Sequence, residues 1–449
     1  MASTSQRPDA VSLASTLVVA ALVAAAGYAT WRETPAAAAR WEPMVGTPGA
    51  ATTSRADLTR SASALRARLT AEPAEPAASV ALAAVLIRQA RVDSDPALTR
   101  EAEAVVSEAL GRYPADYQTR RMLATVLLSQ HRFREAIDVA TRSRDLQPDD
   151  AWNYGVLGDA HLELGEYEAA RAAYDTMMRI RPGAQAYARM AHALELAGDL
   201  EGALDTMRMA AEGTSAHDPE SLAWHYAQLG HLYFVMGRLD DADREYRRAA
   251  FTFPDHPYAR AGRAQVAAAD GRYTEALGLA QPLFDETGSP EMAALIGDLH
   301  AALGDAAPAT HFYDEAERLE RAGWAWEQPQ PAARARLLAD RALRTDVAVE
   351  LAERAIAERG DILTEDALAW AYYRAGRLGE AAAAAARALR TGTQDRRILY
   401  HSAAIRLALG DEANARMLLD RALDGHPTFD LVNAPAARAL RDALEGQAD

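Results

Sequence analysis

Eleven histidines and paired carboxylates such as Asp240 and Asp241 are the residues of this chain best suited to metal or acid–base chemistry. Hydrolytic zinc sites place two histidines one helical turn apart with a glutamate between them, as in HExxH. His225 and His231 lie six residues apart, and no HExxH occurs. The chain has no cysteine, which excludes thiolate ligands, disulfides and cysteine nucleophiles. We therefore predict no metal site.

The paired carboxylates have a structural explanation. Asp240 and Asp241 lie where a helix is expected to begin, and the helix dipole favours negative charge there. The sequence also lacks a GxSxG nucleophile motif, a phosphate-binding P-loop and a dinucleotide-binding GxGxxG after a strand. We expect no catalytic residues and no cofactor.

Composition limits the class of partner. The chain has 449 residues, 49% of them hydrophobic but only 7% aromatic, and much of the difference is alanine, the best helix former. Its net charge is −16 with no long basic run, whereas phosphate backbones require positive charge. The composition indicates a helical protein that does not bind nucleic acid.

Large and small residues follow a fixed scheme in YAQLGHLYFVMGRLDDADREY, residues 226–246. Tyr226, Leu229 and Tyr233 share one face of a helix, and Gly230 lies on the same face. Gly237 is expected to end this helix before a second one begins. We attribute the small residue at position 230 to the close approach of the two helices, so the spacing serves packing.

The same 34-residue scheme recurs along the chain. A helix pair cannot bury its apolar face alone, so each pair is expected to pack on the next. Good copies cover residues 117–150, 151–184, 257–290, 290–323, 362–395 and 396–429, and weaker copies lie near residues 77–116, 184–216 and 329–361.

This scheme resembles the tetratricopeptide repeat, a helix–turn–helix unit. The resemblance implies an all-α, right-handed α-solenoid of about ten units, and the chain as a whole is similar to bacterial envelope proteins with an N-terminal anchor. The expected organisation is an N-terminal capping helix at 55–76, units 1–7 at 77–323, a Trp/Pro-rich interruption at 324–332, units 8–10 at 333–429, and a C-terminal capping helix at 430–449.

The resemblance also implies a binding surface. In this family, positions two, five, nine and twelve of each unit point into the concave groove. The alternative is that aromatic residues there pack on neighbouring units or stiffen the groove. The family's chaperone-tail clamp is not expected, because it uses lysine and this chain has none. The candidate groove residues are Trp152, Asp159, His192, Trp224, His231, Phe234, Tyr258, Trp370 and Tyr373.

The N-terminal part has its own pattern. Residues 1–9 form a short tail, residues 10–31 carry no charge, and residues 32–54 are rich in proline and glycine, typical of a flexible spacer. As a helix, the uncharged run spans roughly 33 Å, near the hydrocarbon thickness of a bilayer. We expect an uncleaved transmembrane or signal-anchor helix; a cleaved signal peptide and a soluble helix are the alternatives.

Together these features predict a non-enzymatic, membrane-tethered scaffold that binds a peptide or partner protein in its concave groove. The solenoid is expected outside the cytoplasm, on a single-pass protein of the cytoplasmic membrane; secretion or a periplasmic location after cleavage is the alternative. The alternative function is an accessory or assembly subunit of an envelope enzyme or a polysaccharide-export complex. A regulator that faces the cytoplasm is a third interpretation.

Overall fold

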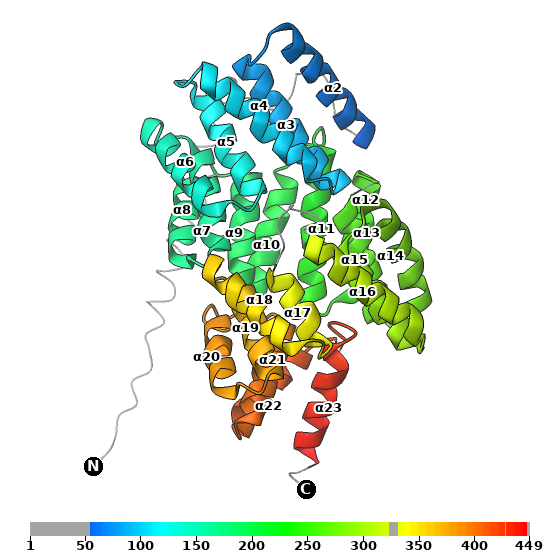
Figure 1. Cartoon of the computed structure of the whole chain (residues 1–449). Coiled ribbons are helices and arrows are strands. Elements are labelled where there is room, and N and C mark those ends of the chain that lie inside the picture. The colour runs from blue at the N-terminus through cyan, green and yellow to red at the C-terminus, as the bar shows by residue number, and fades with distance from the viewer. Residues whose placement is uncertain (1–53, 255, 323–330, 427, 447–449) are drawn as a thin grey trace, which may run out of the picture. The chain divides into compact units, whose positions relative to one another are not determined.

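The computed structural model describes residues 54–254, 256–322, 331–426 and 428–446. These residues form α-helices and no strand (Figure 1), which confirms the all-α prediction. The predicted tail, membrane helix and most of the spacer lie outside the described residues, as does most of the interruption at 324–332. Within the part of the chain that is described, no helix is long and apolar enough to cross a membrane.

The helices follow one another in ten antiparallel pairs flanked by two single helices, α2 (Arg55–Ala71) and α23 (Asn433–Glu445). Seven pairs precede residue 323: α3 (Pro76–Asp93) and α4 (Ala97–Arg112), α5 (Tyr117–Ser129) and α6 (Phe133–Leu146), α7 (Ala151–Glu163) and α8 (Tyr167–Ile180), α9 (Ala184–Leu196) and α10 (Leu200–Glu212), α11 (Pro219–Val235) and α12 (Leu239–Thr252), α13 (Pro257–Ala269) and α14 (Tyr273–Thr287), and α15 (Pro290–Leu303) and α16 (Ala306–Ala322). Three pairs follow: α17 (Pro331–Asp340) and α18 (Thr345–Glu358), α19 (Ile362–Arg374) and α20 (Leu378–Ala388), and α21 (Arg396–Ala408) and α22 (Glu412–Leu423).

Local signals set the helix boundaries. Asp150 caps α7 through its side chain, and Gly165 ends the same helix at a φ of 76°, a conformation that favours glycine. Helix α11, which carries Tyr226 and Gly230, begins at Pro219. Proline is favoured at the first helical position because its missing N–H has no partner there in any case.

Within three pairs, a tyrosine of the second helix packs on a glycine of the first. Tyr174 covers Gly158, and Tyr313 covers Gly297, so closely that a β-carbon on either glycine would overlap the ring. The third such pair is Tyr246 and Gly230. The small residue therefore makes room for a ring, which is more specific than the expected close approach of two backbones.

Pairs far apart in the sequence also touch. The carbonyl oxygen of Leu164, at the end of α7, accepts a hydrogen bond from the Gly360 N–H at 3.3 Å. The neighbouring Glu163 carboxylate forms an ion pair with Arg359 at 2.7 Å. In Figure 1, α18 and α19 accordingly lie beside the ends of α7 and α9.

The next two pairs repeat this arrangement. A β-carbon on Gly198 would overlap the Gly392 carbonyl, and a β-carbon on Gly237 would lie 2.5 Å from the backbone nitrogen of His426. The contacts Leu164–Gly360, Gly198–Gly392 and Gly237–His426 are called the return contacts below. Through them, the turns of three successive early pairs meet three successive loops of the late pairs.

Candidate functional site

Trp152 lies at the start of α7 and is attached to the preceding pair. Asp150 accepts a hydrogen bond from the Trp152 N–H at 3.0 Å, which fixes the first turn of the helix. The indole Nε1–H donates to the Thr125 hydroxyl at 2.8 Å, and the Arg121 guanidinium lies 5.2 Å from the ring centroid. The half-buried Trp152 side chain therefore joins α7 to α5, and part of its surface is used in packing.

Asp159 joins α7 to the next pair. Its carboxylate accepts a hydrogen bond from the Tyr174 hydroxyl at 2.9 Å and forms an ion pair with Arg189 of α9 at 2.9 Å. Burial, and then the neighbouring Asp159 carboxylate, raise the pKa of Tyr174 well above its usual value. Asp159 is thus neutralised by Arg189, a partner that the repeat positions did not indicate.

Two predicted histidines share one carboxylate. The Glu195 side chain lies 2.8 Å from His231 Nε2 and 3.3 Å from His192 Nδ1. Burial opposes the ionised form of Glu195, but the two imidazoles outweigh that effect and lower its pKa. Burial likewise opposes the charged imidazoles, yet Glu195 raises the pKa of both. The cluster bridges α9 and α11, and each histidine side chain remains almost half exposed.

Glu195 was missed as a candidate, although a signal for it existed. It occupies position twelve of the unit that starts at Ala184, one of the four positions that the repeat pattern assigns to the groove. Two imidazoles and one carboxylate suggest metal ligation, but no group of three or more such side chains is arranged to hold a metal ion in the described segments.

Three further predicted aromatic residues lie on α11 and α13. Trp224 and Phe234 are half-buried against the apolar cluster of α11. Tyr258 is 51% exposed, and its ring lies 5.8 Å from the buried His256 ring. Charged groups from three other helices, Arg91, Glu220 and Glu291, act on the Tyr258 phenol. The Tyr258 phenol therefore lies within electrostatic reach of charges on α3, α11 and α15.

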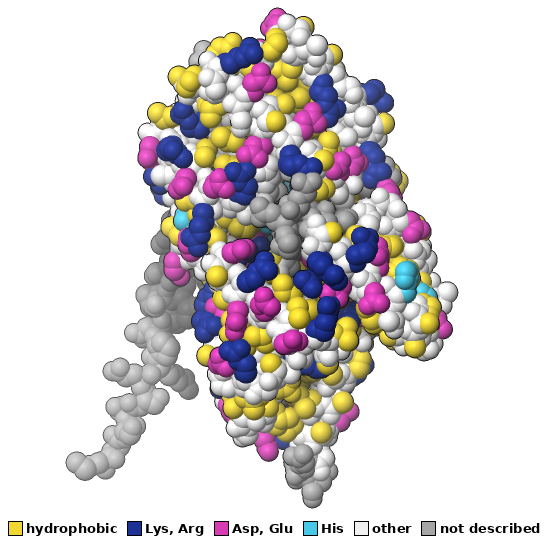
Figure 2. Space-filling model, viewed as in Figure 1, with side chains coloured by type: hydrophobic (Ala, Val, Ile, Leu, Met, Phe, Trp, Pro, Cys, Tyr) yellow, Lys and Arg dark blue, Asp and Glu magenta, His cyan; other side chains and the backbone are white. Residues whose placement is uncertain are grey.

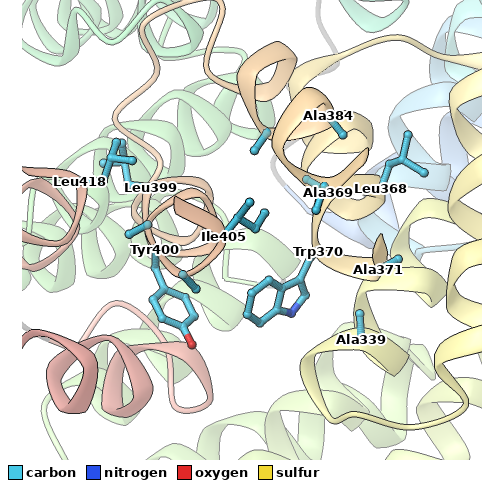
Figure 3. Packing of buried hydrophobic residues seen from close by; sticks show 14 of the residues in the cluster. Ala339, Leu368, Ala369, Trp370, Ala371, Ala384, Leu399, Tyr400, Ile405 and Leu418 are labelled. Atoms are coloured by element: carbon cyan, nitrogen blue, oxygen red, sulfur yellow. The ribbon is translucent and has the colours of Figure 1, made fainter. Parts of the chain in front are cut away.

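Trp370 differs from the expectation that it lines an open groove. Its side chain is only 2% exposed. The ring stacks on Tyr373 at 4.9 Å and on His401 at 4.0 Å between centroids. Figure 3 shows Trp370 pointing into the cluster formed with Ala339, Ile405 and their neighbours. The late pairs close around this position, so Trp370 offers a partner no surface.

The buried His401 beside Trp370 lies between two carboxylates. His401 lies 3.0 Å from Asp366 and 3.6 Å from Asp340, and its side chain is fully buried. Burial disfavours the imidazolium, but the two carboxylates outweigh burial and raise the pKa of His401 to about 9. His401 is therefore protonated at neutral pH, and its single positive charge offsets one of the two negative charges of Asp340 and Asp366.

A cavity of about 400 Å³ lies between the early and late pairs. Its walls come from α11, α13, α15 and α16 on one side and from α17, α21 and the chain just before α23 on the other. Predicted residues His231 and Phe234 line it. The other lining residues are Val235, Gln265, Ala268, Ala269, Pro290, Glu291, Ala294, Leu295, Asp298, Glu320, Ala333, Arg336, Leu337, Asp340, Arg341, Asp395, Arg396, Arg397, Phe429, Asp430, Leu431, Val432 and Asn433.

This lining combines apolar side chains with arginines and carboxylates. None of the lining residues carries a hydroxyl or thiol, but several carry a carboxyl group and His231 carries an imidazole. Figure 2 shows acidic and arginine side chains interspersed on one face of the molecule, with apolar side chains between them. Such a lining can recognise a ligand by charge and apolar contact.

Comparison with known proteins identifies the repeats. Tetratricopeptide-repeat families match residues 127–194 and, separately, residues 98–151, 228–282 and 367–428. The matched stretches are tetratricopeptide repeats.

Individual relatives are distant. An Hsp70-Hsp90 organizing protein of Triticum aestivum is 35% identical over 82 residues, which is 18% of this chain and 14% of that protein. The chain thus spans only about one seventh of the length of this curated relative.

Two solved structures are similar to part of this chain. A thermophilic tetratricopeptide-repeat protein of Thermus thermophilus has a TM-score of 0.35 at 21% identity, covering 38% of this chain and 92% of that one. PilF of Pseudomonas aeruginosa has a TM-score of 0.39 at 16% identity, covering 48% of this chain and 97% of that one.

Proposed function

Because this chain carries tetratricopeptide repeats, we propose that it is a non-enzymatic scaffold that binds a peptide segment or partner protein on its inner surface. The observation that carries the proposal is the row of large, partly exposed side chains on successive first helices. His192, His231 and Tyr258 are each about half exposed, and Glu195 holds the two histidines in place. A preformed surface of this kind loses little conformational entropy on binding.

The tether belongs to the same proposal. Residues 10–31 would anchor the scaffold in the cytoplasmic membrane, and residues 32–54 would connect it to the repeats. In this arrangement the repeats lie outside the cytoplasm and present a partner with a surface near the membrane. The uncharged run of 22 residues in the sequence supports the anchor.

Site-specific photo-crosslinking tests the proposal. A photoreactive residue at position 258 would report on the inner surface. The same residue at position 251 would serve as the control, because Phe251 is 90% exposed on the second helix of its pair. We expect full-length protein in its native host to capture one defined partner from position 258 and not from position 251. Equal capture from both positions, or none from position 258, would refute the inner surface as the binding site.

The tether has a separate test. Reporter fusions after residue 54 should be active outside the cytoplasm. Activity of the fused reporter only inside the cytoplasm would reverse the proposed orientation. Release of the protein from washed membranes without detergent would contradict the anchor. A partner that carries an enzyme activity would favour the role of accessory subunit.

A further inference from the structure

We infer that the cavity between the early and late pairs is a binding site for a small organic anion, a carboxylate or phosphate on a compact apolar body. Two guanidinium groups in its wall, Arg336 of α17 and Arg397 of α21, would hold the anionic group. This inference does not rest on the scaffold function proposed above, because a small ligand is a different occupant from a protein partner.

The two arginines lack the partners that other arginines of the cavity have. Arg341 forms an ion pair with Asp298, and Arg396 donates to the His426 carbonyl at 2.6 Å. By contrast, neither guanidinium of Arg336 and Arg397 has a hydrogen bond or an ion pair within the described residues. The Arg397 Nε is buried without a partner. Burying an unpaired cation is costly, so both groups have unused capacity to bind an anion.

These two cations also repel each other. The positive charge of Arg397 is the largest cause that lowers the pKa of Arg336, and burial adds to it. An anion between two guanidinium groups would remove that repulsion. Each guanidinium presents N–H groups in a fixed planar fork that matches the two oxygens of a carboxylate or phosphate.

The carboxylates of the cavity are mostly engaged elsewhere. Asp340 faces the protonated His401, and Asp298 is paired with Arg341. Asp395 caps α21 by accepting hydrogen bonds from two backbone N–H groups, and Asp430 does the same for α23. Asp340, Asp395, Asp430 and the nearby Asp366 still stabilise the charge of Arg397 from a distance. Within the described residues, however, none of them forms a hydrogen bond or an ion pair with the guanidinium of Arg397 or Arg336.

Glu320 is the remaining carboxyl group. It is 7% exposed, and burial raises its pKa to about 7, while Arg336 and Arg334 act in the opposite direction. The group is therefore partly protonated near neutral pH and neutralises Arg336 only in part. A protonated carboxyl group can also donate a hydrogen bond to a bound anion.

The rest of the wall limits the size and character of the ligand. A volume of about 400 Å³ is near the lower end of the range for small-molecule sites. Phe234, Leu295, Leu337 and Phe429 supply apolar surface from four separate segments. A simple inorganic ion would leave that surface unused, so we assign an organic anion.

Calorimetric titration of the full-length protein tests this site. The probes are 3-phenylpropionate and phenyl phosphate, with 3-phenyl-1-propanol as the uncharged analogue and inorganic phosphate as the ion without an apolar body. We expect both organic anions to bind at least about tenfold more tightly than either control, since a hydrogen bond to a charged group is worth that much. Equal binding of the alcohol, or no binding of either organic anion at millimolar concentration, would overturn the assignment.

Three variants assign the binding to these residues. Arg336→Gln and Arg397→Gln should each lower the affinity for phenyl phosphate at least about tenfold. Arg142→Gln, at an exposed arginine of α6, should not weaken it. If Arg336→Gln does not fold, Arg336→Lys is the substitute. It keeps the positive charge but lacks the planar array of N–H groups, so it should still weaken the binding of phenyl phosphate. Equal loss in the Arg142 variant would refute the site.

A titration with a peptide distinguishes the small-ligand site from the scaffold function. If an acidic ten-residue peptide binds in an Arg336-dependent way and 3-phenylpropionate does not, the small-ligand assignment is wrong. The partner surface around Tyr258 is tested independently by crosslinking, so either proposal can fail alone.

Discussion

The aromatic ring of Tyr246 lies directly over the α-carbon of Gly230, and a β-carbon at position 230 would be 2.8 Å from the ring. The contact joins α12 to α11 inside one repeat. A β-carbon on Gly262 of the next repeat would overlap the same ring. One tyrosine thus fixes the spacing of three helices.

Replacing Gly230 by alanine should therefore lower the free energy of unfolding. Overpacking of a core typically costs about 1–3 kcal/mol. Gly278 is the matched control, because it lies within helix α14 and its added β-carbon would meet no atom within 4 Å. Gly278→Ala should stabilise the protein by about 0.5–1 kcal/mol. Chemical denaturation of both variants measures the difference, and equal effects would contradict the packing role.

A second prediction concerns the His192–Glu195–His231 cluster. The lowered pKa of Glu195 contributes stability that is lost as the pH falls below about 4.5, and the raised pKa of the histidines contributes stability that is lost as the pH rises above about 6.5. Between these limits, Glu195→Gln should cost on the order of 1 kcal/mol, because the histidines are partly exposed and screened. The pKa of both imidazoles should fall in the variant, as measured by NMR titration. Unchanged histidine pKa values would contradict the shared carboxylate.

Trp152 and Trp224 occupy the same repeat position but differ in their contacts. The Trp152 indole donates to Thr125, whereas no hydrogen bond of the Trp224 indole joins it to any described residue. Trp152→Phe should therefore destabilise the protein by about 0.5–1.5 kcal/mol, and Trp224→Phe should have a smaller effect. Thermal melting of the two variants checks this. The same two proteins should then be compared for partner capture, which decides whether either ring is an anchor.

The return contacts predict a difference between two turn glycines. Gly165 and Gly376 both have a φ near 75°, so alanine is strained at either position. Only at Gly165 would the new methyl group also overlap the Gly360 carbonyl; at Gly376 it would meet no atom within 4 Å. Gly165→Ala should cost more than Gly376→Ala. It should also speed hydrogen exchange at residues 359–365, across the contact, and equal protection there in both variants would contradict the return contacts.

Glu320 gives a pH-dependent prediction. Burial raises its pKa to about 7, so the folded protein binds this proton more tightly than the unfolded chain does. Stability contributed by this group must therefore fall as the pH rises from about 4.5 to about 7. Glu320→Gln should stabilise the protein by about 1–3 kcal/mol at pH 8 and by little at pH 4. A variant that is less stable than the parent at pH 8 would show that the carboxylate has a partner.

The repeat period could be predicted because it encodes contacts between neighbours. Gly158, Gly230 and Gly297 each mark a first helix, and each receives a tyrosine from the second helix of its own pair. Such contacts are local in sequence, and these three lie 72 and 67 residues apart, which is about two repeats. The periodic pattern therefore predicts the helix pairs and the faces that they bury.

The closure of late pairs on early ones could not be predicted from that period. Position nine of a repeat is expected to face an open groove, yet Trp370 at that position is buried under His401. Likewise, the repeat pattern gives no reason for Gly165 to meet Gly360. These contacts depend on how sharply the chain of repeats curves, which is a sum of small rotations that no single repeat specifies.

The return contacts change the kind of cooperativity that the protein should have. In an open array, each repeat is coupled only to its two neighbours, and the ends can melt while the middle stays folded. Here a repeat near residue 165 is also coupled to one nearly two hundred residues later. Such a repeat contacts three others, its two neighbours and one distant repeat. Unfolding of that repeat therefore removes contacts that stabilise all three. Folding, in turn, must wait until most of the chain has been made, because the loop closed by such a contact spans almost half its length.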